Sequence, residues 1–219
     1  VLKEQLDTRI HQPADLRDHG HQVLGVVPAM TRQIEDEFGG EDTIEVEGQR
    51  LRTTLAMIVS PMSAAAEAYR RIRTNLQFAR PDDEVHTFAV SSADKGAGKT
   101  TTTANLALAL ASAGEQVVVI DADLRRPWLH ELLGLERKPG LSSILYDDTP
   151  SYEQFATGID HLSVIPAGAE VPNPAELLGS GRMRRLIDTL DDQFDYVLID
   201  TPPALLFSDM LGLAPHCDG

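Results

Sequence analysis

The sequence predicts an α/β fold, in which a mostly parallel sheet is wound by helices on both of its faces. Two observations carry this prediction: strands and helices alternate along residues 86–200, and the strand at 116–121 is apolar at nearly every position. A strand that is apolar throughout is typical of a sheet covered on both faces, and parallel strands need a crossover between them. The composition agrees, because 42% hydrophobic and 24% charged residues are ordinary values for a globular protein.

The N-terminal part, residues 1–53, is expected to be an extension ahead of the main domain at 54–219. A short polar helix, a turn around Pro13, a second helical turn and an apolar strand at 22–28 are predicted in that order. Residues 31–53 are acidic and show little periodicity. This pattern favours a mobile, solvated linker over a binding segment.

The main domain is predicted to begin with a helix, because Ala65, Ala68 and Ile72 recur at the spacing of one helix face. Strands and helices then alternate. Pro174 is suited to the first turn of a helix, since a proline lacks the N–H group that would be unpaired there. The expected elements are a helix at 63–79, a strand at 86–92, a helix at 99–113, strands at 116–121 and 161–166, a helix at 174–190 and a strand at 196–200.

A glycine-rich loop between the first of these strands and the next helix predicts a phosphate site. Residues 93–100 fit the P-loop pattern, with alanine in place of its first glycine. Backbone N–H groups of such a loop and of the helix start bind phosphate oxygens, and Lys99 adds a positive charge. The alternative is a glycine-rich turn with an incidental lysine. The pattern predicts ATP or ADP with Mg²⁺ as cofactors, bound by Lys95, Gly96, Ala97, Gly98, Lys99, Thr100 and Thr101.

Carboxylates at the ends of two predicted strands complete the expected nucleotide site. Asp121 and Asp123 belong to one strand end, and Asp200 belongs to another. Ligands of an open α/β sheet bind just outside the carboxyl ends of the strands, so the three side chains should converge near Lys99 and Thr100. Taken singly, a strand-end aspartate is more simply a helix cap. Three of them beside a P-loop indicate a magnesium–nucleotide site, for which the predicted metal residues are Thr100, Asp123 and Asp200.

Charge and cysteine content argue against several other classes of protein. The formal net charge is −15, which argues against DNA or RNA as a partner. Cys217 is the only cysteine, so neither an internal disulfide nor a cysteine zinc site can form. The longest apolar run near the P-loop, residues 106–111, is far shorter than the roughly 20 residues of a membrane span. Since the chain opens at Val1 and ends abruptly at Gly219, we expect a fragment of a longer protein.

Several stretches resemble motifs of the bacterial tyrosine kinases, P-loop enzymes of the MinD/ParA-like superfamily that control capsule and exopolysaccharide export. DADLRRP at 121–127 is similar to their DxDxR motif, and IDTPP at 199–203 is similar to their Walker B motif. EAYRRIR at 67–73 matches their ExxRxxR oligomerisation motif. Residues 6–28 are similar to the juxtamembrane segment of membrane-bound members. ExxRxxR is a weak signal by itself, and together with DxDxR it is fairly specific.

The resemblance implies an ATP-dependent protein tyrosine autokinase that regulates exopolysaccharide or capsule chain length and export. Asp121 would position or deprotonate the tyrosine hydroxyl. The implied partners are further copies of the chain in a ring, a membrane-anchored polysaccharide export machinery and a cognate tyrosine phosphatase, at the cytoplasmic face of the bacterial plasma membrane. The implied catalytic residues are Lys99, Asp121 and Asp123. The implied oligomerisation residues are Glu67, Arg70 and Arg73, for which pairing within their own helix is the alternative.

Two departures from the family pattern keep other functions open. KGAGKT at 95–100 is close to the deviant Walker motif of the MinD/ParA ATPases, where a lysine at the position of Lys95 reaches the nucleotide of the neighbouring subunit. A positioning ATPase of that type is therefore one alternative. The family's tyrosine cluster is missing, since the tyrosines are scattered at Tyr69, Tyr146, Tyr152 and Tyr196. A non-catalytic module, whose nucleotide only sets the assembly of the exporter, is the other alternative. A further strand is expected after Gly219, because the last three residues resemble the start of one.

Overall fold

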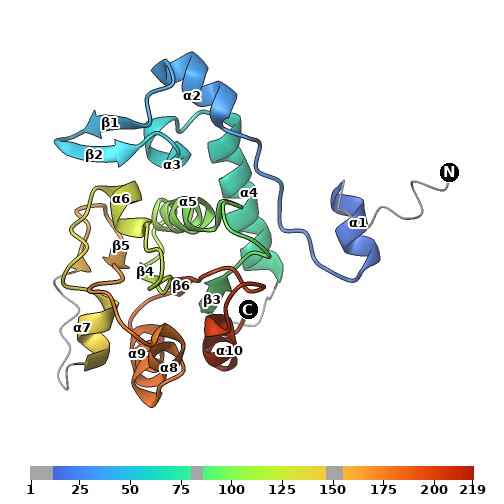
Figure 1. The fold of residues 1–219 in the computed structure, drawn as a ribbon. Helices are drawn as coiled ribbons and strands as arrows, with labels where there is room; N and C mark the ends of the chain where they lie inside the picture. Colours follow the sequence, from blue (N-terminus) through green and yellow to red (C-terminus); the bar gives the residue numbers. More distant parts are fainter. Residues whose placement is uncertain (1–11, 80–85, 147–154) are drawn as a thin grey trace.

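The computed structural model describes residues 12–79, 86–146 and 155–219, with a parallel sheet at the centre (Figure 1). The strands are β3 (Thr87–Val90), β4 (Val117–Asp121), β5 (Leu162–Ile165) and β6 (Tyr196–Asp200). Their spatial order is β3-β6-β4-β5, and each neighbouring pair is parallel. The structure confirms the predicted α/β class and these four predicted strands.

Helices cover both faces of this sheet (Figure 1). Val117 and Val119 of β4 pack into one core, and the alternate residues Val118 and Ile120 pack into the other. All five residues of β4 are buried, as the apolar run predicted. The first core is covered by α4 (Ala64–Ala79), α5 (Lys99–Ala111) and α6 (Leu129–Leu133). The second is covered by α7 (Leu141–Tyr146), α8 (Pro174–Leu178), α9 (Gly181–Asp191) and α10 (Asp209–Leu213), with a 3-10 turn at Ala214–His216.

The single helix expected at 174–190 is wrong, because the chain turns at Gly179 and forms α8 and α9 instead. Ser180 caps the second helix, and its hydroxyl accepts a hydrogen bond from the Met183 N–H at 3.3 Å. A Cβ on Gly212 of α10 would lie only 2.9 Å from the Cα of Gly179. The two glycines therefore let the backbones of α8 and α10 approach closely, and a continuous helix gives way to that packing.

The strand expected at 22–28 is also wrong. This segment pairs with no strand among the described residues, and it runs along α4 after the short helix α1 (Pro13–Asp18) (Figure 1). The Asn75 side chain donates a hydrogen bond to the Leu24 carbonyl at 2.6 Å, and a Cβ on Gly25 would overlap the Ile72 side chain. Its apolar residues thus contact a helix and not a sheet. The polar helix expected before Pro13 lies outside the described residues.

Residues 31–53 are structured, so the expected mobile linker is wrong for this part of the chain. They form α2 (Thr31–Phe38) and a hairpin of β1 (Thr43–Val46) and β2 (Gln49–Arg52), followed by α3 (Ala56–Val59). The hairpin turns at Glu47 and Gly48, both at positive φ, and Leu51 is buried in the same core as α5 and α6. The apolar residues that alternate with the acidic ones were the missed signal. The domain limit at residue 53 remains a prediction.

The last residues of the chain lie beside β3, at the edge of the sheet. The Asp218 N–H donates to the Thr87 carbonyl at 2.8 Å, and the Ala89 N–H donates to the Gly219 carbonyl at 2.9 Å. These two bonds resemble strand pairing, and the strand expected after Gly219 remains a prediction. Among the helices in the described ranges, none combines the length and the apolar character that a membrane crossing requires.

Candidate active site

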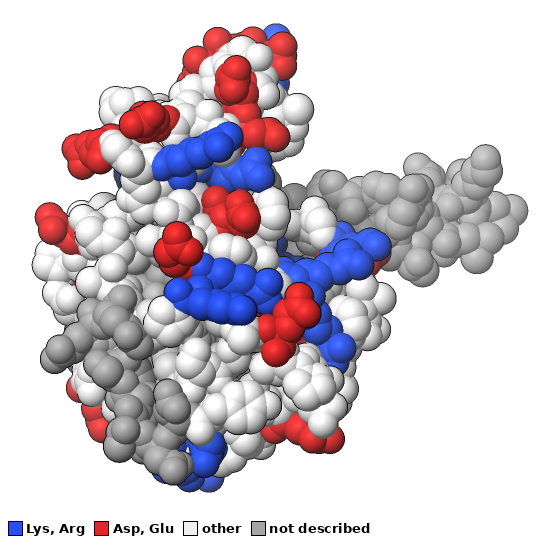
Figure 2. Space-filling model, turned by 60° about the vertical axis from the view of Figure 1, so that its left-hand side comes forward, with Lys and Arg blue, Asp and Glu red and all other residues white. Residues whose placement is uncertain are grey.

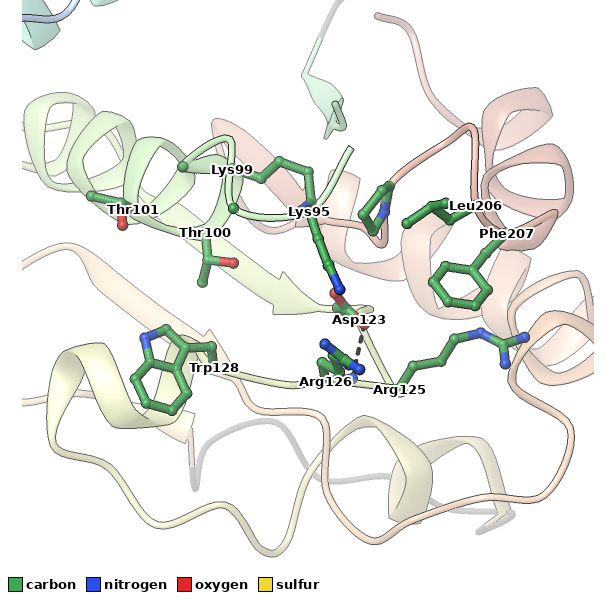
Figure 3. Close-up of a pocket in the computed structure, with 13 residues that line it drawn as sticks. Lys95, Lys99, Thr100, Thr101, Asp123, Arg125, Arg126, Trp128, Leu206 and Phe207 are labelled. Carbon is green, nitrogen blue, oxygen red and sulfur yellow. Dashed lines mark hydrogen bonds between the residues drawn. The ribbon is translucent and has the colours of Figure 1, made fainter. Parts of the chain in front are cut away.

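A cavity of about 660 Å³ opens at the carboxyl ends of the strands (Figure 3). Its walls come from three segments, which follow β3, β4 and β6 respectively. A cavity of this size at this edge of the sheet is suited to a nucleotide. The lining residues are Lys95, Gly96, Gly98, Lys99, Thr100 and Thr101 after β3, Asp123, Arg125, Arg126 and Trp128 after β4, and Pro203, Leu206 and Phe207 after β6.

The loop wall has the backbone shape that phosphate binding requires. Gly96 and Gly98 have φ angles of 75° and 88°, in the left-handed region that favours glycine. A Cβ at either position would meet no atom within 4 Å, so space beside the loop is open to a ligand. Gly98 also caps the N-terminus of α5, whose first N–H groups are available to an anion. Of the predicted nucleotide residues, only Ala97 does not line the cavity.

Asp200, Thr100 and Lys99 meet beside this loop, as the sequence predicted. The Thr100 hydroxyl donates a hydrogen bond of 2.6 Å to Asp200, although the two residues are 100 positions apart. Burial raises the pKa of Asp200 to about 7, and the Thr100 hydrogen bond and the Lys99 charge limit that rise. Lys99 is therefore close enough to act on the carboxylate electrostatically.

The two carboxylates of the DxDxR motif occupy different environments. Asp123 lines the cavity and accepts a hydrogen bond from the Arg126 N–H at 3.0 Å, drawn as a dashed line in Figure 3. Asp121 is fully buried beside Asp200 in the strand register and does not line the cavity. Burial and the charge of Asp200 raise the pKa of Asp121 well above its ordinary value. The structure thus brings Asp123 to the cavity surface and keeps Asp121 behind it.

The oxygen atoms behind the loop fit a magnesium ion. One carboxylate oxygen of Asp121 is buried and has no hydrogen-bond partner among the described residues, and Asp200 and Thr100 supply further oxygens. Within the described ranges, no group of three or more His, Cys, Asp and Glu is placed to hold a metal by itself. Mg²⁺ does not need such a group, because it is usually held by one or two carboxylates together with substrate phosphates and water.

The wall opposite the loop contains residues to which the sequence analysis gave no role. Arg125 makes two hydrogen bonds to the buried Asp209, at 2.7 and 3.0 Å, and its guanidinium lies 4.5 Å from the ring centre of Phe207. The hydrogen bonds that Arg125 donates to Asp209 raise the pKa of Arg125. Arg125 is the arginine of the DxDxR pattern, so this motif could have indicated that Arg125 belongs to the site. Nothing in the sequence pointed to Asp209, which lies 84 positions further on.

Trp128 and Arg52 bring the N-terminal hairpin to the edge of the cavity. The Arg52 guanidinium lies 5.0 Å from the centre of the Trp128 ring, a cation–π distance. Trp128 is 45% exposed and lines the cavity. The hairpin therefore contributes to the surroundings of the site. The sequence had predicted a linker without such a contact for this part of the chain.

The predicted oligomerisation residues lie on α4 and make contacts within their own chain. Arg73 donates a hydrogen bond to the Ala109 carbonyl of α5 at 2.9 Å, which ties the two helices together. Arg70 donates to the Pro61 carbonyl at 2.7 Å and lies 3.5 Å from Glu67. These contacts are the intrachain alternative, and the role of the three residues in a ring remains a prediction.

The sequence of this chain is similar to one protein family model and to several named bacterial proteins. A family model described as an AAA domain matches residues 85–214. Tyrosine-protein kinase YwqD of Bacillus subtilis is 41% identical over 174 residues, which are 78% of this chain and 73% of that protein. Tyrosine-protein kinase wzc of Salmonella typhi is 33% identical over 218 residues. These residues are 99% of this chain and only 30% of that protein.

Solved structures agree with the sequence comparison. The kinase domain of the Escherichia coli tyrosine kinase ETK superposes with a TM-score of 0.81 at 31% identity, over 94% of this chain and 78% of that one. The cell division ATPase MinD of Pyrococcus furiosus has a TM-score of 0.50 at 29% identity, over 61% of this chain and 56% of that one. The fold is thus shared with MinD, while the kinase domain covers far more of the molecule. With the cavity, the P-loop and the carboxylates in place, the chain belongs to the bacterial tyrosine-protein kinases.

Proposed function

We propose that this chain is the catalytic domain of a protein tyrosine autokinase that uses ATP and Mg²⁺. The observation that carries the proposal is the meeting of Lys99, Thr100 and Asp200 beside an open cavity lined by the P-loop. The loop from Gly96 to Thr101 would hold the phosphates through its N–H groups. Lys95 would add a further charge to the phosphate region, since it lies on the same wall.

The reaction would transfer the γ-phosphoryl group of ATP to a tyrosine hydroxyl. The phenolic oxygen forms a bond to the γ-phosphorus, the bond from that phosphorus to the β-γ bridging oxygen breaks, and ADP leaves. Lys99 and the loop N–H groups offset negative charge on the phosphate oxygens, which is the main catalytic task in phosphoryl transfer. Thr100, Asp123 and Asp200 would hold Mg²⁺, directly or through water, and the ion would supply positive charge beside the phosphates.

The burial of Asp121 supports a division of roles between the two carboxylates of the DxDxR motif. Asp123 is the one that reaches the cavity, so we assign to it the contact with the acceptor hydroxyl and its departing proton. Asp121 would act from behind, through Asp200 and the metal, because the cavity does not extend to it. The resemblance to the family had placed Asp121 at the acceptor itself.

The wider role that we propose is regulation of exopolysaccharide or capsule chain length and export. The family membership and the similarity of residues 6–28 to a juxtamembrane segment support it. The chain spans 73% of YwqD and 30% of wzc, so the activity and partners of a whole protein are part of this proposal. The proposed partners are further copies in a ring joined through Glu67, Arg70 and Arg73, a membrane-anchored export machinery and a tyrosine phosphatase, at the cytoplasmic face of the membrane.

The test is phosphotyrosine formation by the full-length parent protein. The parent is incubated with ATP and Mg²⁺ and blotted with an antibody against phosphotyrosine, and the Lys99→Met variant serves as the control. A signal in the parent that the variant lacks supports the proposal. Equal signals, or none, would overturn it. If ATP changes the oligomer size in light scattering without phosphate transfer, the protein is a non-catalytic assembly module. ATP-dependent dimers with slow hydrolysis would instead indicate a positioning ATPase, for which Lys95 is the motivating residue.

A further inference from the structure

Arg126 is a cation on the cavity wall that the proposed phosphate chemistry does not use. It follows β4 and lies on the wall opposite the P-loop, between Arg125 and Trp128 (Figure 3). Its backbone N–H is held by Asp123, which fixes the position of the residue. Its side chain is exposed and makes no ion pair or hydrogen bond with any of the described residues.

The other cations on this side of the cavity already have partners. Arg125 is bound on two atoms by Asp209. Arg52 lies over the Trp128 ring and 3.5 Å from Asp42. Among the described residues of this wall, Arg126 thus has the guanidinium that remains available to an incoming ligand. Guanidinium groups bind carboxylates strongly because two N–H groups can donate together.

With a nucleotide held by the P-loop, this wall would form the acceptor side of the cavity. Phosphates bound by the loop would lie against the other wall, and the acceptor oxygen has to approach the γ-phosphorus on the side away from the leaving ADP. Asp123, three residues before Arg126, is the carboxylate that we assigned to the acceptor hydroxyl. A residue next to the acceptor tyrosine in its own chain would therefore come close to Arg126.

We propose that the acceptor is a tyrosine-containing segment with acidic residues next to the tyrosine, and that Arg126 selects it. This inference rests on the proposed kinase function and adds a substrate class to it. Trp128 beside Arg126 would contact the apolar part of the same segment.

The positive charge around the cavity supports an acidic acceptor segment, although the protein is acidic as a whole. The net charge is −15, yet the cavity lining holds four cationic side chains and one carboxylate. Figure 2 shows a group of lysine and arginine side chains across the middle of the face in view, with aspartate and glutamate side chains beside it. Because charges are screened beyond about 8 Å at physiological salt, the local cations decide the contact and the distant carboxylates matter little.

The test compares three peptides that differ only at the residues flanking one tyrosine, which are glutamate, glutamine or lysine. Their phosphorylation by the full-length protein is measured as kcat/KM, and their binding in the presence of ADP and Mg²⁺ is measured by fluorescence anisotropy. We expect the glutamate peptide to bind at least fivefold more tightly than the glutamine peptide, with a matching ratio in KM. Arg126→Gln should remove this ratio, and Arg126→Glu should invert it in favour of the lysine peptide. Arg184→Gln, an exposed arginine on α9 outside the cavity, should keep it.

The outcomes separate this inference from the proposed function. If all three peptides are phosphorylated and bound equally, or if Arg126→Gln keeps the preference, Arg126 does not select the acceptor while the kinase function stands. If Arg126→Gln lowers kcat equally for all peptides and leaves the binding ratios unchanged, the inference is wrong. Arg126 would then stabilise charge during the reaction and would not select the acceptor. If the full-length protein forms no phosphotyrosine on itself or on any peptide, the kinase function fails, and the inference fails with it.

Discussion

The loop wall of the cavity is one continuous stretch of chain, whereas the opposite wall joins segments that are distant in sequence. Residues 95–101 form the loop wall by themselves, with glycines at positive φ. The opposite wall depends on Arg125, which contacts Asp209 at a separation of 84 residues, and on Arg52, which contacts Trp128 from the hairpin. The loop wall presents backbone N–H groups together with the side chains of nearby loop residues, and the opposite wall presents side chains held by long-range contacts.

Because the two walls are built differently, substitutions in them should alter different properties of the protein. A backbone site depends on local conformation, so its variants should mainly alter nucleotide binding. A wall held by a buried ion pair depends on long-range packing, so its variants should alter stability as well as the shape of the cavity. Variants in the two walls should therefore separate a loss of binding from a loss of stability.

Lys99→Met is expected to have the largest effect on activity. The substitution removes the loop's central charge, and the loss of one such stabilising group typically lowers kcat by about 100- to 1,000-fold. The free energy of unfolding should hardly change. Autophosphorylation rates and thermal melts of the parent and the variant measure both quantities. If Lys99→Met loses activity only in proportion to the fraction of protein that is unfolded, the proposed separation between the two walls is wrong. Lys95→Met on the same loop should lower kcat clearly less than Lys99→Met does.

Asp200→Asn is expected to stabilise the protein above pH 7. The pKa of Asp200 is about 7 in the folded chain against an ordinary 3.8, so from about pH 4 to 7 the folded chain holds a proton that the unfolded chain has released. Stability therefore falls as the pH rises through this range. At about 1.4 kcal/mol per pH unit, the cost approaches about 4 kcal/mol above pH 7.

Denaturant melts of the wild type and Asp200→Asn at pH 4 and pH 8 measure this effect. The two proteins should be about equally stable at pH 4, and the variant should be the more stable one at pH 8. In the wild type, Mg²⁺–ATP should bind more weakly below pH 7, because protonated Asp200 is a poorer oxygen donor. A variant that is less stable than the wild type at pH 8 would contradict the assigned burial cost.

Arg125→Leu is expected to destabilise the protein through the opposite wall. It leaves Asp209, whose side chain is fully buried, without its ion-pair partner. Loss of one partner of a buried pair costs about 3–5 kcal/mol, and we expect about 2 kcal/mol here because Arg125 is about one-third exposed. Denaturant melts measure the loss. The double variant Arg125→Leu/Asp209→Leu should recover part of it, and no recovery would show that the pair is not the cause.

The same contrast explains what could be predicted from the sequence. The loop wall and the strand ends were predictable, because the glycine spacing and the apolar run before Asp121 are local patterns with a direct structural meaning. The contacts of Arg125 with Asp209 and of Arg52 with Trp128 were not, since each joins residues whose own neighbourhoods carry no matching signal. The hairpin at Glu47 and Gly48 was missed because its acidic residues hid the alternation of apolar ones.

Gly98→Ala is expected to have the smallest effect on the protein. Comparison with Gly158→Ala separates its effect on nucleotide binding from its effect on stability. Both glycines have positive φ, at 88° and 79°, and a Cβ would meet no atom within 4 Å at either. An alanine in this conformation costs about 1–2 kcal/mol at both sites, so the two variants should lose similar stability. Nucleotide affinity should fall about tenfold in Gly98→Ala alone, because its methyl group would occupy space beside the phosphates. Isothermal titration with ADP and Mg²⁺ measures the affinity, and an equal fall in both variants would mean that general strain, and not the shape of the loop, controls binding.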